Sequence, residues 1–249
     1  MLRFDPALDR TAHRAWALPH RPWVMTQSWH DLLFAHWRVD ERLLRPFIPP
    51  AFDIDRFDGS AWLSVVPFTM SRVAPRAVLP LPWLSSFPEL NVRTYVSPRD
   101  GKRGVFFFSL DAARLAAVVA ARTVLCLPYF PARMRVTRAG DAVHYSSRRW
   151  GGGASFAAHY EPAGPAFVPA RGSLAFFLTE RYCLYHLDRF GRPARLEIHH
   201  APWQIQPAHA EITANTMTNR LGFHLEGEPL LHYAKRQDVV TWWPKPLRF

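Results

Sequence analysis

The fold is decided by one stretch, residues 87–130, which reads FPELNVRTYVSPRDGKRGVFFFSLDAARLAAVVAARTVLCLPYF. In its first half LNVRTYV alternates apolar and polar residues and is followed by the turn SPRDGKRG and then by GVFFFSLD, a pattern that predicts two strands in a hairpin. Its second half, AARLAAVVAARTVLC, is rich in alanine and predicts a helix with Asp111 as the N-cap. Because alanine lets a helix lie close to a curved sheet, the stretch indicates a helix packed against strands.

Shorter patterns on both sides of this stretch predict further strands and two short helices. The helices are DERLLRPFIPP, in which Asp40 is the N-cap, and SLAFFLTERY, in which Ser173 is the N-cap. Two more hairpins are expected, one around Asp58-Gly59 and one that turns at Ala139-Gly140-Asp141. Further strands are WHDLLFAHWRVD, CLYHLD, RPARLEIHHAPWQIQPAHAEI and HYAKRQDVVTW, whereas PLPWLSSFPE and SFAAHYEPAGPAFVPARG lack a regular pattern. About ten strands and two or three helices indicate one barrel-like α+β domain.

Composition favours a single domain rich in strands. The chain has 249 residues and is 49% hydrophobic, which is enough for one sizeable core. Its 23 prolines, 12 glycines and 14% aromatic content point away from a helical bundle and toward short strands joined by turns. We therefore expect a loosely docked or disordered polar arm at residues 1–21 and one domain at residues 22–249.

Charge and cysteine content exclude several classes of protein. The formal net charge is +11 and comes from arginines that are spread along the chain, without a run longer than two and without a nucleic-acid-binding motif. Cys126 and Cys183 have no CxxC partner, which is typical of free thiols in a reducing compartment. No segment approaches the roughly 18 apolar residues of a membrane span. We expect a cytoplasmic protein without a nucleic-acid or membrane partner.

The order of the sequence blocks resembles a known family over nearly the whole chain from residue 23. The blocks are WRVDERLLRPFIPPAFDIDRFDGSAWLSVVPF, FPELNVRTYV, GVFFFSLDA, LPY, SLAFFLTERYCLY, IHHAPWQIQPAHAEI and DVVTWWP, and together they resemble the uncharacterised YqjF-like family. That family is similar in fold to acetoacetate decarboxylase. The resemblance implies an α+β, acetoacetate decarboxylase-like barrel of mostly antiparallel strands with a few helices. It also leaves a homo-oligomer open, because relatives with this fold assemble.

The resemblance implies that the catalytic lysine of the decarboxylases is absent here. In those enzymes a Schiff-base lysine follows a proline after the alanine-rich helix, and a second lysine, next in sequence, lowers the pKa of the first. With the helix arginine placed on Arg122, the proline falls on Pro128, the nucleophile on Tyr129 and its neighbour on Phe130. A phenol and a phenyl ring form no Schiff base. We expect no Schiff-base chemistry and no cofactor.

Other site residues of the decarboxylase-like proteins map unevenly. Their site glutamate falls at Glu89, whereas their site arginine falls near His30. Glu89 and Arg93 are four residues apart on an extended segment, so both side chains face the same side of the sheet. They form either a polar floor that orients a carbonyl or carboxylate, or a buried ion pair that closes the barrel. Both alternatives stay open at the level of sequence.

Two further segments carry candidate ligand-binding residues. TERYCLYHLD supplies Glu180 and Tyr182 at a helix-to-strand junction, where they either take part in acid–base chemistry or fasten the helix to the sheet. IHHAPWQIQPAH supplies His200 and Trp203. Adjacent histidines on a strand point to opposite faces and cannot bind one metal ion without a bulge, so no metal site is expected.

Aromatic residues near Glu89 are candidates for the wall of a pocket. Trp62 and Trp83 would surround a ligand together with Trp203, and Arg122 or Arg93 would anchor its carboxylate. The alternative is that these rings simply belong to the core, as aromatic residues usually do.

The leading hypothesis is a protein that binds a keto or carboxylic acid in an aromatic pocket. Any activity would be lyase-like or hydrolase-like, with Glu89 as the acid–base group and Tyr129 as a hydrogen-bond donor. The alternatives are a ligand-binding module without catalysis and a structural or interaction protein whose barrel is filled.

Overall fold

The computed structural model describes residues 9–76, 78 and 85–247. Trp83 and the first half of the segment PLPWLSSFPE therefore lie outside the described residues. The strands are β1 Met25–Val39, β2 Phe52–Ile54, β3 Ala61–Pro75, β4 Phe87–Pro98, β5 Gly104–Ala112, β6 Tyr129–Ala139, β7 Ala142–Arg149, β8 Ser155–Pro162, β9 Cys183–Leu187, β10 Pro193–His200, β11 Gln206–Asn215, β12 Leu230–Thr241 and β13 Lys245–Pro246. The helical segments are α1 Glu41–Leu44, η2 Arg45–Phe47, α3 Leu115–Ala120, the π-helix η3 Ala121–Leu125, α4 Leu174–Thr179 and η4 Asn219–Leu221.

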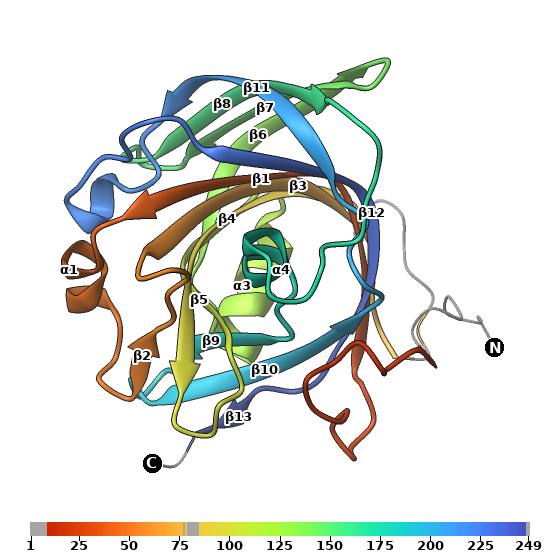
Figure 1. The fold of residues 1–249 in the computed structure, drawn as a ribbon, viewed down its shortest axis with the longest axis vertical. Coiled ribbons are helices and arrows are strands. Elements are labelled where there is room, and N and C mark those ends of the chain that lie inside the picture. Colours follow the sequence, from red (N-terminus) through yellow and green to blue (C-terminus); the bar gives the residue numbers. More distant parts are fainter. Residues whose placement is uncertain (1–8, 77, 79–84, 248–249) are drawn as a thin grey trace.

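The strands form a closed barrel with a second sheet layer on one side. Strands β1, β3, β4, β5, β9, β10 and β12 pair in a ring, which β10–β12 and β12–β1 close (Figure 1). Strands β6, β7, β8 and β11 form the outer layer, joined to the ring through β5–β6 and β11–β12. Pairing is antiparallel except at β5–β6 and β5–β9. The expected α+β barrel of mostly antiparallel strands is confirmed.

Two apolar cores lie on the two faces of the barrel wall. Leu33, Leu63 and Val92 pack between the barrel and the outer layer, whereas their strand neighbours Phe34 and Trp62 pack inside the barrel. Successive side chains of a strand point to opposite faces, so strands buried on both faces carry nearly continuous apolar sequence.

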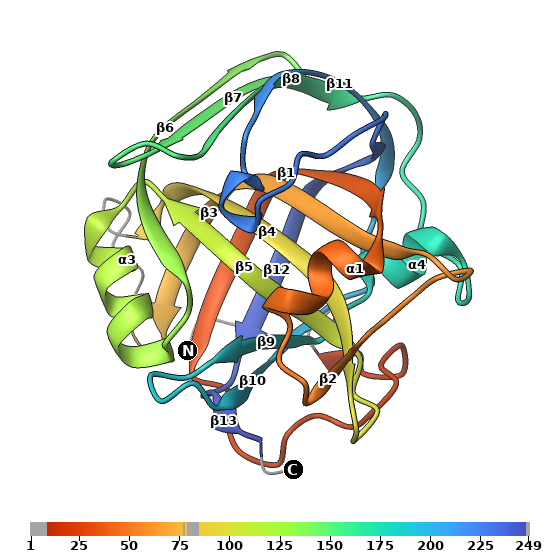
Figure 2. The ribbon, with the colours of Figure 1, turned by 90° about the vertical axis from the view of Figure 1, so that its left-hand side faces the viewer.

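Helices α3 and α4 cover opposite ends of the barrel, as Figure 2 shows. Helix α4 begins as expected, because the Ser173 hydroxyl accepts a hydrogen bond from the amide of Phe176. Its Leu178 side chain is fully buried in the barrel interior. Helix α1 likewise begins at Asp40, whose carboxylate accepts from the amide of Arg42.

The expected hairpins are confirmed at β4–β5 and at β6–β7. The turn at Asp58-Gly59 also forms, closed by a bridge between Phe57 and Ser60. The hairpin predicted around it is wrong, because β2 pairs with β4 and not with β3. The segment 155–172 was expected to be irregular, yet its first half forms β8, which completes the outer layer between β7 and β11.

The alanine-rich helix starts later than expected. Helix α3 begins at Leu115, and its N-cap Arg114 makes no side-chain capping bond. Asp111 lies within β5, where its carboxylate accepts hydrogen bonds from the guanidinium of Arg149 on β7. Pairing with a buried cation outweighs capping, because a carboxylate without exposure to water requires a counter-charge.

The described part of the N-terminal arm is fastened to β10. Arg14 is 7% exposed and donates to the carbonyl of Ile198 at 2.8 Å. The His13 ring stacks on His199 and contacts the carbonyl of His200. Residues 13 and 14 therefore attach this part of the arm to the barrel wall.

Candidate functional site

Three polar side chains follow one another on the inner face of β4. Glu89, Asn91 and Arg93 occupy alternate positions, and all three are at most 8% exposed. On an extended strand, alternate side chains lie about 7 Å apart on the same face. The polar row faces the interior cluster that includes Phe34 and Trp203.

Glu89 is paired with a phenol and not with a cation. The hydroxyl of Tyr129, the first residue of β6, donates to Oε2 of Glu89 at 2.7 Å. Burial raises the pKa of Glu89 to about 8; the hydrogen bond from Tyr129 partly offsets this effect, and the charge of Asp111 adds to it. Glu89 is therefore mainly protonated at neutral pH, while burial raises the pKa of Tyr129 well above its usual value.

Arg93 is a buried cation without a carboxylate partner among the described residues. None of the ion pairs in that part of the chain includes it. Its Nη2 donates to the carbonyl of Leu178 on α4 at 3.4 Å, and its Nε has no hydrogen-bond partner. Burial lowers its pKa, although the neighbouring Tyr95 opposes that shift. The ion pair that the sequence left open between Glu89 and Arg93 does not form.

A hydrogen-bonded relay lies beside Arg93. Ser64 pairs with Arg93 across β3–β4 and with His36 across β1–β3, so these positions form one row on the inner face. The Ser64 hydroxyl lies 2.6 Å from Nδ1 of His36 and 2.7 Å from the hydroxyl of Tyr95, which donates to the carbonyl of Leu178. Burial, together with the charges of His232 and Arg93, holds the pKa of His36 well below its usual value.

This relay is not predicted by the sequence patterns above. The sequence feature that could have revealed the relay is a polar residue at an inner-facing position of an otherwise apolar strand. These residues are His36 in WHDLLFAHWRV and Ser64 in AWLSVVPF. That signal becomes specific only once the strand register places the two positions opposite each other.

Several buried polar atoms of the interior have no hydrogen-bond partner. These atoms are Nε2 of His36, Nε1 of Trp62, Oδ1 of Asn91, Nε of Arg93, Nε1 of Trp203 and Nδ1 of His232. Buried polar atoms in native proteins are almost always paired, with protein, ordered water or ligand. Among the described residues, six of the thirteen unpaired buried side-chain atoms lie in the barrel interior.

Of the predicted ligand-binding residues, Glu180, Tyr182, His200 and Trp203 form one cluster. The Tyr182 hydroxyl and the Trp203 amide both donate to the carboxylate of Glu180. The His200 ring stacks on Tyr182 at 4.6 Å and lies 5.2 Å from Trp203. The carboxylate therefore links the end of α4 to the loop after β10, as in the fastening alternative, while Trp203 also meets Phe34 inside the barrel.

His30 and Arg122 lie apart from this row. Nε2 of His30 lies 2.7 Å from the hydroxyl of Ser71, and burial lowers the pKa of His30. Arg122 is exposed on η3. Of the two arginines that were predicted to anchor a ligand carboxylate, Arg93 is buried and Arg122 is not.

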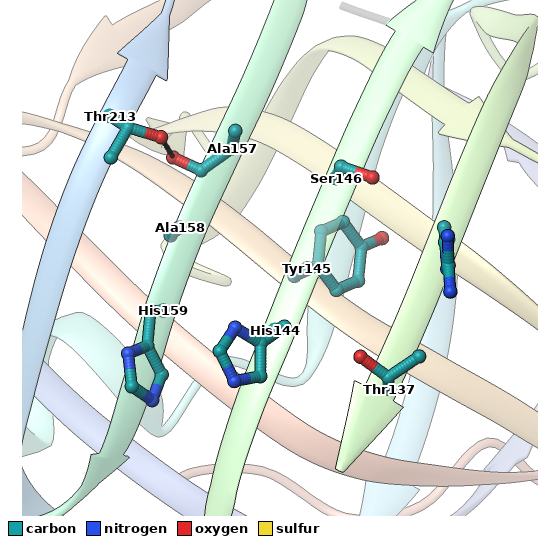
Figure 3. A pocket seen from close by; sticks show the side chains of 9 residues that line it. Thr137, His144, Tyr145, Ser146, Ala157, Ala158, His159 and Thr213 are labelled. Carbon is teal, nitrogen blue, oxygen red and sulfur yellow. Dashed lines mark hydrogen bonds between the residues drawn. The ribbon is translucent and has the colours of Figure 1, made fainter. Parts of the chain in front are cut away.

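Two hollows lie on the outer face of the β6–β7–β8–β11 layer and not at the polar row. The larger has a volume of about 510 Å³ and includes Arg135, Thr137, His144 and His159. Figure 3 shows His144 and His159 side by side on β7 and β8, and their rings stack at 4.2 Å. The smaller hollow, of about 320 Å³, adjoins it at His159. The side chains of Arg135, Thr137, His144 and His159 are exposed, so water can satisfy their polar groups, unlike those of the buried polar row.

Neither a metal-binding cluster nor a membrane-spanning helix occurs within the described ranges. No group of three or more histidine, cysteine, aspartate or glutamate side chains in the described part of the chain could hold a metal ion. No helix of the described residues has the length and apolar character needed to cross a membrane.

A family model for DUF2071, described as an uncharacterized conserved protein, matches residues 26–238. The chain belongs to the DUF2071 family. It is 44% identical over 242 residues to the uncharacterized protein YqjF of Bacillus subtilis (strain 168), covering 96% of this chain and 98% of that protein. The resemblance to the YqjF-like family is thereby confirmed.

Solved structures similar to this DUF2071 protein share its fold at low sequence identity. The enduracididine biosynthesis enzyme MppR, with HEPES buffer bound, matches with a TM-score of 0.66 and 13% identity, over 91% of this chain and 88% of that chain. Acetoacetate decarboxylase from Legionella pneumophila matches with a TM-score of 0.63 and 12% identity, over 100% of this chain and 97% of that chain. An acetoacetate decarboxylase-like enzyme from Sphingomonas wittichii RW1 matches with a TM-score of 0.62 and 13% identity, over 92% of this chain and 94% of that chain. These matches confirm the acetoacetate decarboxylase-like fold.

Proposed function

We propose that this protein binds a small keto or carboxylic acid inside the barrel and that its chemistry does not use a Schiff-base lysine. The observation that carries the proposal is Arg93, a buried guanidinium without a carboxylate partner in the described part of the chain. A buried charge is costly unless it is paired, and a ligand carboxylate would supply the missing partner. Glu89 cannot do so, because at neutral pH its carboxyl is mainly protonated and therefore uncharged.

Glu89 and Tyr129 supply the acid–base chemistry of this proposal. A group with a pKa of about 8 exchanges its proton readily near neutral pH, which suits a general acid or base. Tyr129 remains protonated, and its single O–H, once turned away from Glu89, can donate a hydrogen bond to an oxyanion that develops beside Glu89. Both groups lie within one hydrogen bond of each other, so a ligand carbonyl could contact both.

The positions of the lysines support a mechanism without a Schiff base. Nζ of Lys102 lies 3.4 Å from the carboxylate of Glu197, and Lys235 and Lys245 are exposed. MppR has also been solved in complex with pyruvate, which supports a keto acid as the ligand of a barrel of this shape. Close aromatic packing of Phe34 and Trp203, with ring centroids 5.0 Å apart, favours the rival candidate, a filled barrel.

A thermal-shift screen of keto and hydroxy acids with borohydride trapping tests the proposal. We expect acids to raise the melting temperature of the wild type, a smaller shift for Glu89→Gln, and no mass gain after borohydride. The matched control is Glu161→Gln, which removes an exposed carboxylate on β8 and should respond like the wild type. A trapped adduct would overturn the lysine-free mechanism, and the absence of any shift would favour the filled barrel.

A further inference from the structure

The polar groups of the barrel interior lie toward its two ends. Arg93 bonds to the carbonyl of Leu178 on α4, which covers one end. Glu89 bonds to Tyr129, which follows α3 and η3 in sequence at the other end. Four residues of extended strand separate the Cα atoms of Glu89 and Arg93 by about 13 Å. A three- or four-carbon acid held by Arg93 would reach only part of the way to Glu89.

Aromatic rings connect the two ends. The Arg93 guanidinium lies 5.5 Å from the ring centroid of Phe34, which lies 5.0 Å from that of Trp203. Trp203 stacks on Trp29 at 6.2 Å, and Trp29 contacts Phe68 at 5.7 Å. Phe68 pairs directly with Glu89 across β3–β4. A continuous row of contacting aromatic rings therefore connects the cation to the strand position opposite the neutral carboxyl.

The end covered by α4 is rich in hydrogen-bond donors. Unpaired Nε of Arg93 and Nε1 of Trp62 can only donate, while the unpaired ring nitrogens of His36 and His232 can each donate or accept, depending on the tautomer. The His36 and His232 rings lie 5.9 Å apart, and His36 is in the same cross-strand row as Arg93. One cation surrounded by neutral donors suits a single carboxylate and not a dianion.

We propose that the interior takes a monocarboxylate with an apolar body of about six to ten carbons, an alkyl chain or an aryl group, whose carboxylate binds Arg93 and whose far end reaches Glu89 and Tyr129. This inference rests on the proposed function for the location of the ligand and adds its class. His36 and His232 act as specificity residues that donate to the carboxylate beside Arg93. Asn91, midway along β4, is placed to hydrogen-bond a hydroxyl on the ligand body.

A chain-length series measured by titration calorimetry tests the inference. The probes are unbranched monocarboxylates from propanoate to dodecanoate, 4-phenylbutanoate and the short keto acids pyruvate and 2-oxobutanoate. We expect affinity to rise about fourfold for each added methylene up to eight to ten carbons and to fall beyond that length. Equal affinity at all lengths, or a preference for the short acids, would overturn the inference.

Variants separate this inference from the proposed function. Arg93→Met should weaken the preferred acid by about tenfold or more, because the carboxylate loses its charged partner. The control, Lys235→Met, removes an exposed cation on β12 and should bind like the wild type. If Arg93→Met does not fold, the chain-length series on the wild type still tests the inference without it. Short acids that bind only when Glu89 is present would leave the proposed function intact and overturn the chain-length inference, whereas binding by no acid would overturn both.

Discussion

Burial raises the pKa of Glu89 into the physiological pH range, and this affects both the stability of the protein and its chemistry. Its pKa in the folded protein, about 8, lies above the usual value of 4.5. Between these two values the folded state holds a proton that the unfolded state has lost. The contribution of Glu89 to stability is therefore complete below pH 4.5 and is lost as the pH rises through about 8.

The first prediction concerns Glu89→Gln. Glu89 should make the unfolding free energy fall by up to about 1.4 kcal/mol per pH unit between pH 5 and pH 8. An amide does not titrate, so the variant should lack this fall. Urea unfolding of the wild type and the variant across that range gives the difference. Identical pH dependence in the two proteins would show that Glu89 does not carry a raised pKa.

The second prediction concerns the hydrogen bond that Tyr129 donates to Glu89. That bond favours the ionised carboxylate, so Tyr129→Phe should raise the pKa of Glu89 further. Carboxyl titration by ¹³C NMR measures the shift. Tyr233→Phe, which removes a phenol bonded to Asp31, serves as the control and should leave Glu89 unchanged.

At the scale of the elements, one ion pair joins the barrel to the outer layer. Asp111 on β5 and Arg149 on β7 lie 2.5 Å apart at closest approach, with side chains 0% and 4% exposed. Removing one partner of such a pair leaves an uncompensated charge, whereas removing an exposed pair costs little. The third prediction is that Arg149→Met lowers the unfolding free energy by about 3 kcal/mol or more.

Chemical denaturation measures that loss, and an exposed pair gives the matched control. Arg192 and Asp188 form an i, i+4 pair in which the arginine side chain is exposed, so Arg192→Met should cost less than about 1 kcal/mol. Adding Asp111→Asn to Arg149→Met should restore part of the loss, because it removes the unpaired charge. Equal losses at Arg149 and Arg192 would refute a stabilising role for the buried pair.

Local sequence patterns predict the elements better than they predict their partners. The N-caps Asp40 and Ser173 are right because each cap is satisfied within its own turn. Asp111 is wrong as a cap because its partner Arg149 is 38 residues away in sequence. The hairpin at Asp58-Gly59 is wrong for a similar reason: a turn fixes the direction of the chain, whereas long-range pairing brings β2 to β4.

The same limit applies to the site. Strand periodicity places Glu89 and Arg93 on one face, and the family resemblance points to Tyr129. Neither reveals His36, Ser64 or the relay that they form, because that cluster depends on the register of three strands. Sequence therefore identifies the titratable groups of β4 and misses the neighbours that determine their environment.

At the scale of the whole molecule, three of the buried histidines contribute strongly to the response to acid. Burial lowers the pKa of His200 to about 3, that of His232 to about 4 and that of His36 well below its usual value. Their neutral forms stabilise the fold above the unfolded value of about 6.5, and this contribution is lost as the pH falls through each folded pKa.

The fourth prediction is that these three histidines together take up about three protons when the protein unfolds at pH 5. Glu89 acts in the opposite direction, because it releases its proton on unfolding. Calorimetric unfolding in buffers of different ionisation enthalpy counts the protons. His232→Gln should reduce the uptake by about one, and His209→Gln, at an exposed position of β11, serves as the control. An unchanged proton count in His232→Gln would contradict a buried neutral histidine.

The most direct measurement is a crystal structure of the wild type soaked with a medium-chain monocarboxylate such as octanoate. We expect electron density inside the barrel, with the carboxylate within hydrogen-bond distance of the Arg93 guanidinium and the chain along Phe34 and Trp203 toward Glu89. An interior occupied only by protein side chains and water, with Arg93 bonded to them, would contradict the proposed binding site.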